Sequence, residues 1–383
     1  MSGPLTGIRI IEMAGIGPVP YACMLLADLG AEVIRVDRVN GGGMGANPGD
    51  VTARGRKSIA VDLKNPAGVE VVLKLLEGAD VLIECFRPGV MEKLGLGPDI
   101  CSQRNPSLVY GRMTGWGQDG PLASTAGHDV NYIAITGILE SFGNVGEAPP
   151  IPLNVIGDLG GGSMFLLLGV LAALLERQKS GLGQVIDAAI CDGSLSLLST
   201  IHGLKGIGFW ENQREQNMLD GGAPYYRNYL CKDGRSVSVG AIEPHFYAQL
   251  LNKMELDFGA TDFMNQMDKS AWPERRARMA SRFLGKTRDE WCEIFAGSDA
   301  CFAPVLDLDE AAEYPHNKYR NNLVLRDGVL QTAPAPRFSR TPGELTHGPI
   351  AEGADSTTLL SGLGYDAAEV AELLVSGAVK QGA

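Results

Sequence analysis

The sequence lacks several features that would indicate common classes of protein. Its seven cysteines include no C-x-x-C pair, which excludes a thiolate zinc site of familiar spacing. Their odd number favours a reduced compartment, and the start, Met1-Ser2-Gly3-Pro4, does not resemble a signal peptide, so we expect a cytoplasmic protein. The longest apolar run, Met164 to Leu175, is too short to span a membrane. No Gly-x-Ser-x-Gly elbow of an acyl hydrolase occurs.

The charge balance is acidic but uneven along the chain. A formal net charge of −12 over 383 residues argues against a nucleic-acid partner. Residues 1–112 contain 12 Lys and Arg against 12 Asp and Glu, so the remainder of the chain carries the whole excess. A neutral amino-terminal third with clustered arginines could hold an anionic ligand, although such clusters are more often solvated faces.

Short apolar stretches alternate with helical patterns through the first two hundred residues. Strands are expected at 8–14, 31–37, 58–63, 80–86, 108–113 and 184–189, with helices at 20–29, 66–76 and 164–179. This alternation predicts an α/β, Rossmann-like domain with a parallel sheet covered on both faces. Its ligand should lie at the carboxyl ends of the strands.

The residues at these strand ends do not fit a nicotinamide nucleotide. Gly15 and Gly17 follow the first strand, but the third fingerprint glycine is absent and Pro18 lies in the turn. Basic residues suggest instead a ligand with phosphates, which Lys and Arg side chains bind readily. They are Arg38, Arg54, Arg56, Lys57, Lys64 and Arg87.

The second half of the chain indicates a smaller α+β domain. A Gly- and Pro-containing stretch predicts a linker at 201–224, and a hairpin about Lys232–Arg235 and the capping box at Thr287–Glu290 predict the small domain at 225–318. The large domain would then comprise 1–200 and be completed by 319–383, whose final helix is expected at 366–375.

One stretch, from Ala126 to Met164, holds the most suggestive chemistry. His128 and Asp158 form a proton donor and acceptor pair with different intrinsic pKa values. Ser163 is a good N-cap for the apolar helix that follows, and the glycines at 160–162 would let backbone N–H groups approach a ligand. The pattern alone favours the structural interpretation, in which Asp158 is a helix cap and His128 a core residue.

At these residues the sequence resembles the family III CoA-transferase superfamily, and most closely its α-methylacyl-CoA racemases. The resemblance covers nearly the whole chain and rests on several blocks taken together. They include Gly15-Ile16-Gly17-Pro18, Val61-Asp62-Leu63-Lys64, Arg87-Pro88-Gly89-Val90, Gly127-His128-Asp129-Val130-Asn131-Tyr132, Gly157-Asp158-Leu159-Gly160-Gly161-Gly162-Ser163 and Ala241-Ile242-Glu243-Pro244.

The resemblance implies an intertwined homodimer acting on an acyl-CoA thioester, with coenzyme A as part of the substrate and no separate cofactor or metal. By similarity, His128 and Asp158 are the acid/base pair on opposite faces of C2, and Glu243 of the small domain pairs with His128. Asp129 lies beside the thioester with its backbone N–H on the carbonyl oxygen. Coenzyme A contacts are expected at Arg38, Val61, Asp62, Leu63, Lys64, Cys85, Phe86, Arg87, Lys93, Gly127, Asn131 and Tyr132. Position 93 is usually Arg in the bacterial racemases, so Lys93 replaces a fork-shaped donor by a point charge.

The implied reaction is epimerisation of 2-methylacyl-CoA by proton transfer through an enolate. The alternative within the superfamily is a CoA transferase in which Asp158 is the nucleophile. His128 separates the two, because the transferases that resemble this chain generally lack it. A CoA-binding protein without catalytic activity is a third interpretation.

Overall fold

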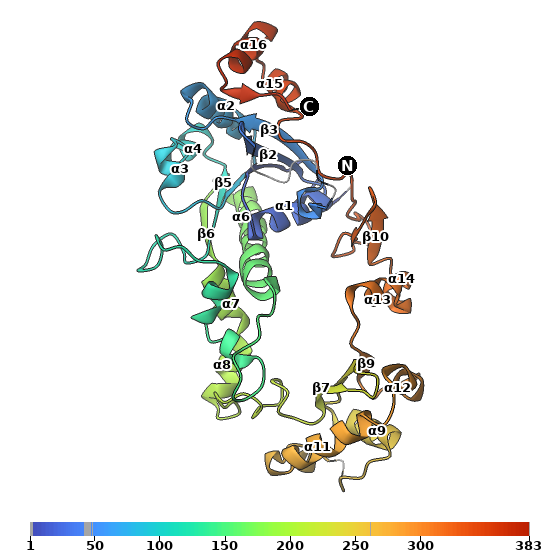
Figure 1. The fold of residues 1–383 in the computed structure, drawn as a ribbon. Coiled ribbons are helices and arrows are strands. Elements are labelled where there is room, and N and C mark those ends of the chain that lie inside the picture. The colour runs from blue at the N-terminus through green and yellow to red at the C-terminus, as the bar shows by residue number, and fades with distance from the viewer. Residues whose placement is uncertain (1–2, 42–46, 48, 261, 383) are drawn as a thin grey trace. The chain divides into compact units, whose positions relative to one another are not determined.

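The computed structural model describes residues 3–41, 47, 49–260 and 262–382, and they form two compact units (Figure 1). The first unit comprises Met1–Thr136, Pro152–Leu197 and Tyr319–Ala383. The second comprises Gly137–Ile151 and Leu198–Lys318. The chain therefore enters the second unit twice. The sequence did not lead us to expect the first of these two segments, Gly137–Ile151, in the second unit. Residues 201–224, which we expected to be a linker, also belong to the second unit.

A seven-stranded sheet organises the first unit. In spatial order its strands are β12 (Val379–Lys380), β3 (Arg56–Val61), β2 (Glu32–Arg38), β1 (Arg9–Met13), β4 (Val81–Glu84), β5 (Val109–Thr114) and β6 (Val185–Ala189). Every pairing is parallel except that of β12 with β3. The expectation of a wholly parallel sheet was therefore wrong at one edge, where the carboxyl-terminal strand returns antiparallel.

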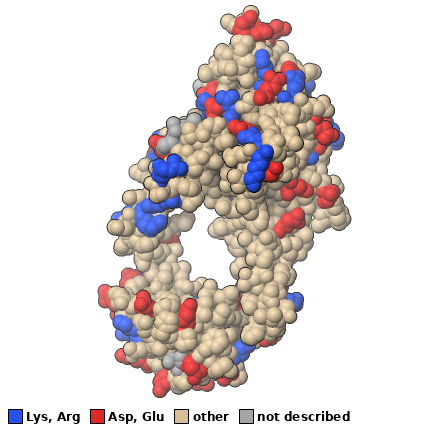
Figure 2. All heavy atoms as spheres, turned by 180° about the vertical axis from the view of Figure 1, so that it is seen from behind, with Lys and Arg blue, Asp and Glu red and all other residues tan. Residues whose placement is uncertain are grey.

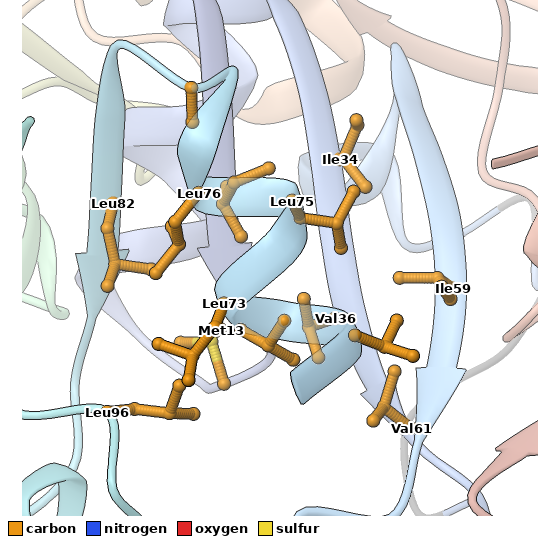
Figure 3. Packing of buried hydrophobic residues seen from close by; sticks show 14 of the residues in the cluster. Met13, Ile34, Val36, Ile59, Val61, Leu73, Leu75, Leu76, Leu82 and Leu96 are labelled. Atoms are coloured by element: carbon orange, nitrogen blue, oxygen red, sulfur yellow. The ribbon is translucent and has the colours of Figure 1, made fainter. Parts of the chain in front are cut away.

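Alternate residues of each strand point to opposite faces of this sheet, as the two-residue period of a strand requires. Ile11 and Ile34 are buried beneath α2 (Pro66–Glu77), in the cluster shown in Figure 3. Their neighbours Ile10 and Val33 are buried on the other face, in a cluster that includes α1 (Pro18–Asp28) and α6 (Met164–Ser180). Both faces are thus covered.

The remaining helices of the first unit are short, and the last one, α16 (Ala367–Val375), has 9 residues. Val370 and Leu373 of the last helix belong to the buried cluster beneath α2, so the end of the chain packs on the amino-terminal sheet. The short helices of the first unit are η1 (Val51–Ala53), α3 (Val90–Lys93), α4 (Pro98–Arg104), α5 (Asp129–Ala134), α7 (Ile190–Leu197), α15 (Ser356–Gly362) and α16. This unit also contains the hairpin formed by β10 (Leu323–Arg326) and β11 (Val329–Thr332).

A π-helix, η3 (Val155–Ser163), runs directly into α6. The expected N-cap at Ser163 was wrong, because this residue has helical backbone angles and its side chain caps nothing. The three glycines serve close packing: a Cβ on Gly161 would lie 2.3 Å from the Ser194 Oγ, and one on Gly162 would lie 3.1 Å from Pro18. Because η3 and α6 are continuous, the helical segment begins 9 residues before the apolar run that starts at Met164.

The combined helix Val155–Ser180 is long and apolar enough to cross a membrane by length and composition. Composition alone does not identify a membrane span, because a core helix passes the same test. Here one side of the helix is buried in the core, through Leu166, Leu167, Val170 and Leu174.

The second unit is built on the three-stranded antiparallel sheet β7 (Tyr226–Leu230), β8 (Ser236–Gly240) and β9 (Phe302–Pro304). The first two strands form the expected hairpin, and the capping box at Thr287 is present. The aromatic core includes Tyr225, Trp272 and Trp291, each almost fully buried. The helices are η2 (Leu139–Ser141), α8 (Ser199–Gly206), α9 (Pro244–Met254), α10 (Phe263–Gln266), η4 (Lys269–Ala271), α11 (Trp272–Phe283), α12 (Arg288–Phe295), α13 (Leu308–Glu313) and α14 (Pro315–Tyr319).

Candidate active site

The strand order of the large sheet reverses between β1 and β4, and the turns after these strands meet there. Strands β2 and β3 extend to one side of β1, whereas β4, β5 and β6 extend to the other. The turn after β1 touches the turn after β4, because a Cβ on Gly15 would lie only 2.1 Å from the Cys85 Sγ. Ligands of open α/β sheets bind at such a switch point.

Asp158 is carried to this point by the π-helix η3. A Cβ on Gly17 would lie 3.3 Å from the Asp158 Oδ2, so the half-buried carboxylate packs on the turn after β1. Asn154 Nδ2 donates a hydrogen bond to the same oxygen at 3.3 Å. Ser163 Oγ donates to the Pro18 carbonyl at 2.7 Å, which fixes η3 against the start of α1. π-helical turns are rare and occur frequently at functional sites.

His128 is the N-cap residue of α5 and is exposed. Its backbone N–H donates to the Asn131 Oδ1 at 3.1 Å, which orders the first turn of the helix. Asp129 follows as the first helical residue, and its carboxylate accepts a hydrogen bond from the Asp158 N–H at 2.7 Å. Helix α5 and helix η3 are therefore joined through the two aspartates.

Burial raises the pKa of Asp158 above its ordinary value. The hydrogen bond from Asn154 lowers that pKa, the negative charge of Asp129 raises it, and the charge of His128 lowers it. The net pKa shift is upward, which favours the protonated carboxyl more than in an exposed aspartate. His128 and Asp158 are thus close enough for their charges to interact.

Tyr132 extends the site toward the end of β4. Its hydroxyl donates to the Gly127 carbonyl, and its ring lies edge-on to Trp116 with centroids 4.7 Å apart. Burial raises the pKa of Tyr132, the charge of Asp158 raises it further, and the charge of Arg87 lowers it. Arg87, Tyr132 and Asp158 therefore share one neighbourhood. The Tyr132 hydroxyl proton is already used in the bond to Gly127. The ring would therefore contact a ligand mainly through its shape.

Four basic side chains surround the carboxyl edge of the sheet and are exposed. Within the described ranges none of them makes an ion pair, which leaves them available to an anion. They are Arg38 at the end of β2, Lys64 after β3, Arg87 after β4 and Lys93 at the end of α3. A cavity of about 400 Å³ opens beside Arg38 at the ends of β1 and β2. Figure 2 shows acidic and basic side chains intermixed on the same face, with wide uncharged areas elsewhere on it.

Three of the six basic residues expected at a phosphate site are engaged elsewhere. Arg54 is 1% exposed and pairs with Asp28 at 2.6 Å. Arg56 is equally buried and pairs with Glu12 at 2.9 Å. The expectation that these two arginines bind phosphate was therefore wrong. Lys57, although exposed, pairs with Glu32.

The other expected coenzyme contacts differ in how far they can reach a ligand. The Val61 side chain is buried in the core beneath α2, so only its backbone could contact a ligand. Leu63 and Phe86 also pack against that core. Asp62 accepts the Lys64 N–H at 3.0 Å and shapes the loop after β3.

Cys85 is half-buried, and its thiol accepts a hydrogen bond from the Ile16 N–H. Burial and the neighbouring Glu84 raise the pKa of Cys85 to about 12. Since a thiolate is the reactive form, this thiol is a packing group rather than a nucleophile.

Glu243 lies in the second unit, where it is the exposed N-cap residue of α9. The first unit alone therefore brings together His128, Asp129, Tyr132 and Asp158. The role of Glu243 stays a prediction.

Sequence reasoning missed two contacts of Asp158. The Gly17 contact and the Asn154 hydrogen bond both depend on the path of η3, and nothing in the sequence marks a π-helix. The glycines about Asp158 were the available signal, since a regular helix rarely contains so many.

Comparisons with known proteins identify the family of this chain. The sequence profile of CoA-transferase family III matches residues 5–356. The chain belongs to CoA-transferase family III. It is 45% identical over 339 residues to an alpha-methylacyl-CoA racemase of Mus musculus, covering 88% of this chain and 87% of that protein. It is 43% identical to the alpha-methylacyl-CoA racemase of Homo sapiens over 344 residues, with the same coverage. A CAIB/BAIF family protein from Brucella suis has the same fold, with a TM-score of 0.80 and 24% identity over 95% of this chain and all of that one. This family III chain is therefore an enzyme of acyl-CoA chemistry.

Proposed function

We propose that this family III enzyme is an α-methylacyl-CoA racemase, which interconverts the (2R) and (2S) epimers of 2-methylacyl-CoA thioesters. The observation that carries the proposal is geometric: His128 directly precedes Asp129, whose carboxylate accepts the Asp158 N–H at 2.7 Å at the switch point of the sheet. Burial raises the pKa of Asp158 at this position. Relatives at 45% and 43% identity that bear the racemase name support it.

The reaction requires a proton to leave one face of C2 and another to arrive at the opposite face. In one direction neutral His128 takes the C2 proton, and protonated Asp158 delivers its own proton from the other side. In the reverse direction ionised Asp158 takes the proton and the His128 imidazolium delivers one. Because both states of Asp158 must be accessible, a raised pKa serves the reaction. The backbone N–H of Asp129, in the first turn of α5, would stabilise the enolate oxygen.

A CoA transferase is the second candidate, because the family description itself names that activity. There Asp158 would attack the thioester to form a mixed anhydride and release coenzyme A. The two candidates differ in their products. A 2-methylacyl-CoA incubated with the enzyme in D₂O should gain deuterium at C2 without any acceptor acid if the enzyme is a racemase. Transfer of coenzyme A to a free carboxylate, with release of the 2-methyl acid and no C2 exchange in the absence of that acceptor, would instead identify a transferase.

Asp158→Asn should abolish the interconversion of the epimers, since the amide can neither take up nor deliver a proton on its side of C2. Exchange of the proton that faces His128 does not need Asp158. Glu176→Gln provides a matched control on the same continuous helix, at an exposed position of α6. It should leave the interconversion unchanged. Interconversion retained by Asp158→Asn would contradict the proposed acid/base role.

We place the phosphates of coenzyme A against Arg38, Lys64, Arg87 and Lys93, which are exposed and without ion pairs in the described part of the chain. Asn131 and Gly127 would line the approach to the thioester. Arg87→Gln should raise KM for the thioester more than it lowers kcat, because phosphate binding is uniform between ground and transition states. Arg104→Gln, which removes an exposed arginine that pairs with Glu70, should change neither constant.

We propose in addition that the enzyme works as a homodimer, in which Glu243 of one copy approaches His128 of the other. An exposed apolar strip on α6 supports a partner: Met164, Leu168 and Leu175 are 49%, 62% and 59% exposed. Isolated proteins rarely leave such a strip in water. Sedimentation equilibrium should give twice the chain mass. Leu168→Glu should reduce the mass toward that of one chain and abolish the exchange together.

A cytoplasmic location is the remaining proposal. All seven cysteines are free thiols, which suits a reducing compartment.

A further inference from the structure

The π-helix η3 begins with backbone N–H groups that have no acceptor inside the helix. Its first internal hydrogen bond runs from the Leu159 N–H to the Asn154 carbonyl at 3.2 Å. The N–H groups of Gly157 and Asp158 precede it and need an acceptor from elsewhere, because the first turn of any helix leaves its donors unpaired.

The Asp129 carboxylate supplies that acceptor. Its Oδ1 accepts the Asp158 N–H at 2.7 Å, and the carboxylate also accepts the N–H of Gly157. The approach is so close that a Cβ on Gly157 would lie 2.2 Å from the same oxygen. Glycine at 157 is therefore required for the contact. Asp129 caps a helix other than its own.

Asp129 also stands at the start of α5, next to His128. One residue thereby touches both sides of the candidate site. Its side chain fixes the turn from which the Asp158 carboxylate projects toward Gly17, and its own backbone N–H belongs to the first turn of α5. The Asp129 side chain therefore links the start of α5 directly to the Asp158 backbone.

We infer that the Asp129 side chain is a positioning residue, which holds Asp158 in register with the thioester through the Gly157 and Asp158 N–H groups. The inference rests on the proposed racemase function. It concerns the carboxylate of Asp129, whereas the expected contact with the substrate uses only the backbone N–H.

The electrostatics support the same role. Burial raises the pKa of Asp129, while the hydrogen bonds from Asp158 and Gly157 lower it. Groups that face Asp158 are Asp129, His128 and Asn154, and the Tyr132 hydroxyl lies near enough to feel its charge. Of these, Asp129 is the one whose charge raises the pKa of Asp158.

Two variants of the full-length enzyme separate position from charge. Asp129→Asn keeps the size of the side chain but removes the charge and one acceptor. Asp129→Glu keeps the charge but displaces the carboxylate by one methylene. Asp187→Asn is the matched control, because the exposed Asp187 carboxylate also accepts a backbone N–H, from Gln118 at 2.9 Å, outside the site.

The assay follows deuterium exchange at C2 of a 2-methylacyl-CoA against pH. For Asp129→Asn we expect kcat to fall about tenfold or more with little change in KM. The limb of the pH–rate profile that reflects the titration of Asp158 should move to lower pH by about 0.5 to 1 unit, because the negative charge that raises the Asp158 pKa is gone. For Asp129→Glu we expect a similar loss of kcat with the limb near its wild-type pH. Asp187→Asn should match the wild type in both.

Hydrogen exchange of the wild-type backbone tests the inference even if a variant does not fold. The amides of Gly157 and Asp158 should be protected to the same degree as that of Leu159. Free exchange of those two amides, or an Asp129→Asn enzyme with wild-type kcat and pH profile, would overturn the inference. A wild-type enzyme that shows no C2 exchange at all would instead refute the proposed function, before any variant is compared.

Discussion

From the contact between Gly17 and Asp158 we can estimate how much stability and activity a Gly17→Ala enzyme should lose. Gly17 has φ 73° and ψ −122°, a backbone conformation that side chains other than glycine rarely adopt. Placing alanine there should cost about 1–3 kcal/mol of folding free energy. The added Cβ would also lie 3.3 Å from the Asp158 Oδ2, so the carboxylate must move by a few tenths of an ångström.

A displacement of that size at a group that transfers a proton should lower kcat about tenfold, since about 1 Å of misplacement can cost about a hundredfold. Gly181→Ala is the matched control. Gly181 has φ 75°, with no heavy atom within 4 Å of an added Cβ. It should lose about 1 kcal/mol of stability and no activity.

Urea unfolding measures the loss of stability, and the rate of interconversion of the two epimers measures the loss of kcat. We expect both variants to lose stability and only Gly17→Ala to lose interconversion. A Gly17→Ala enzyme that is destabilised yet interconverts the epimers at the wild-type rate would refute this, because the Asp158 carboxylate would then not depend on the turn after β1.

Three further predictions concern the rest of the molecule. Arg56→Met should lower the free energy of unfolding by about 3–5 kcal/mol, because it leaves the Glu12 carboxylate buried without its partner; a loss under about 1 kcal/mol in urea would contradict this. Pairing with Arg288 lowers the pKa of Glu310 from 4.5 to about 2, so its stabilising effect is present above pH 4.5 and is lost as the pH falls toward 2. Glu310→Gln should therefore flatten the stability profile across that range, and an unchanged acid limb would disprove the pairing. A thiol reagent should label exposed Cys301 first, and Cys301→Ser should remove the fast phase; a persistent fast phase would point to another cysteine.

Much of the large sheet could be predicted from sequence because its strands are apolar runs between turn residues. The pattern about Ile10 and Ile11 is apolar on both sides, which is typical of a strand buried between two layers of helix. Strand β12 could not be found this way. It has two residues, and its pairing with β3 depends on the return of the chain after α16 rather than on local pattern.

The candidate site, like the sheet, could be predicted from the sequence only in part. His128 and Asp158 could be selected as residues, but sequence spacing carries no information on the π-helix that brings Asp158 to Gly17. Arg54 and Arg56 were misassigned for a similar reason. A basic cluster in sequence looks the same whether its members face water or carboxylates, and here the buried partners Asp28 and Glu12 lie far away in the chain.

The proposed racemase removes a proton from C2 and returns another to the opposite face of the same carbon. The most direct test starts from one pure epimer of a 2-methylacyl-CoA in D₂O, without any acceptor acid, and follows both epimers by chirality and by mass. We expect the opposite epimer to appear and to carry one solvent deuterium at C2. Retention of the starting configuration with no deuterium, while coenzyme A moves to an added carboxylate, would contradict it.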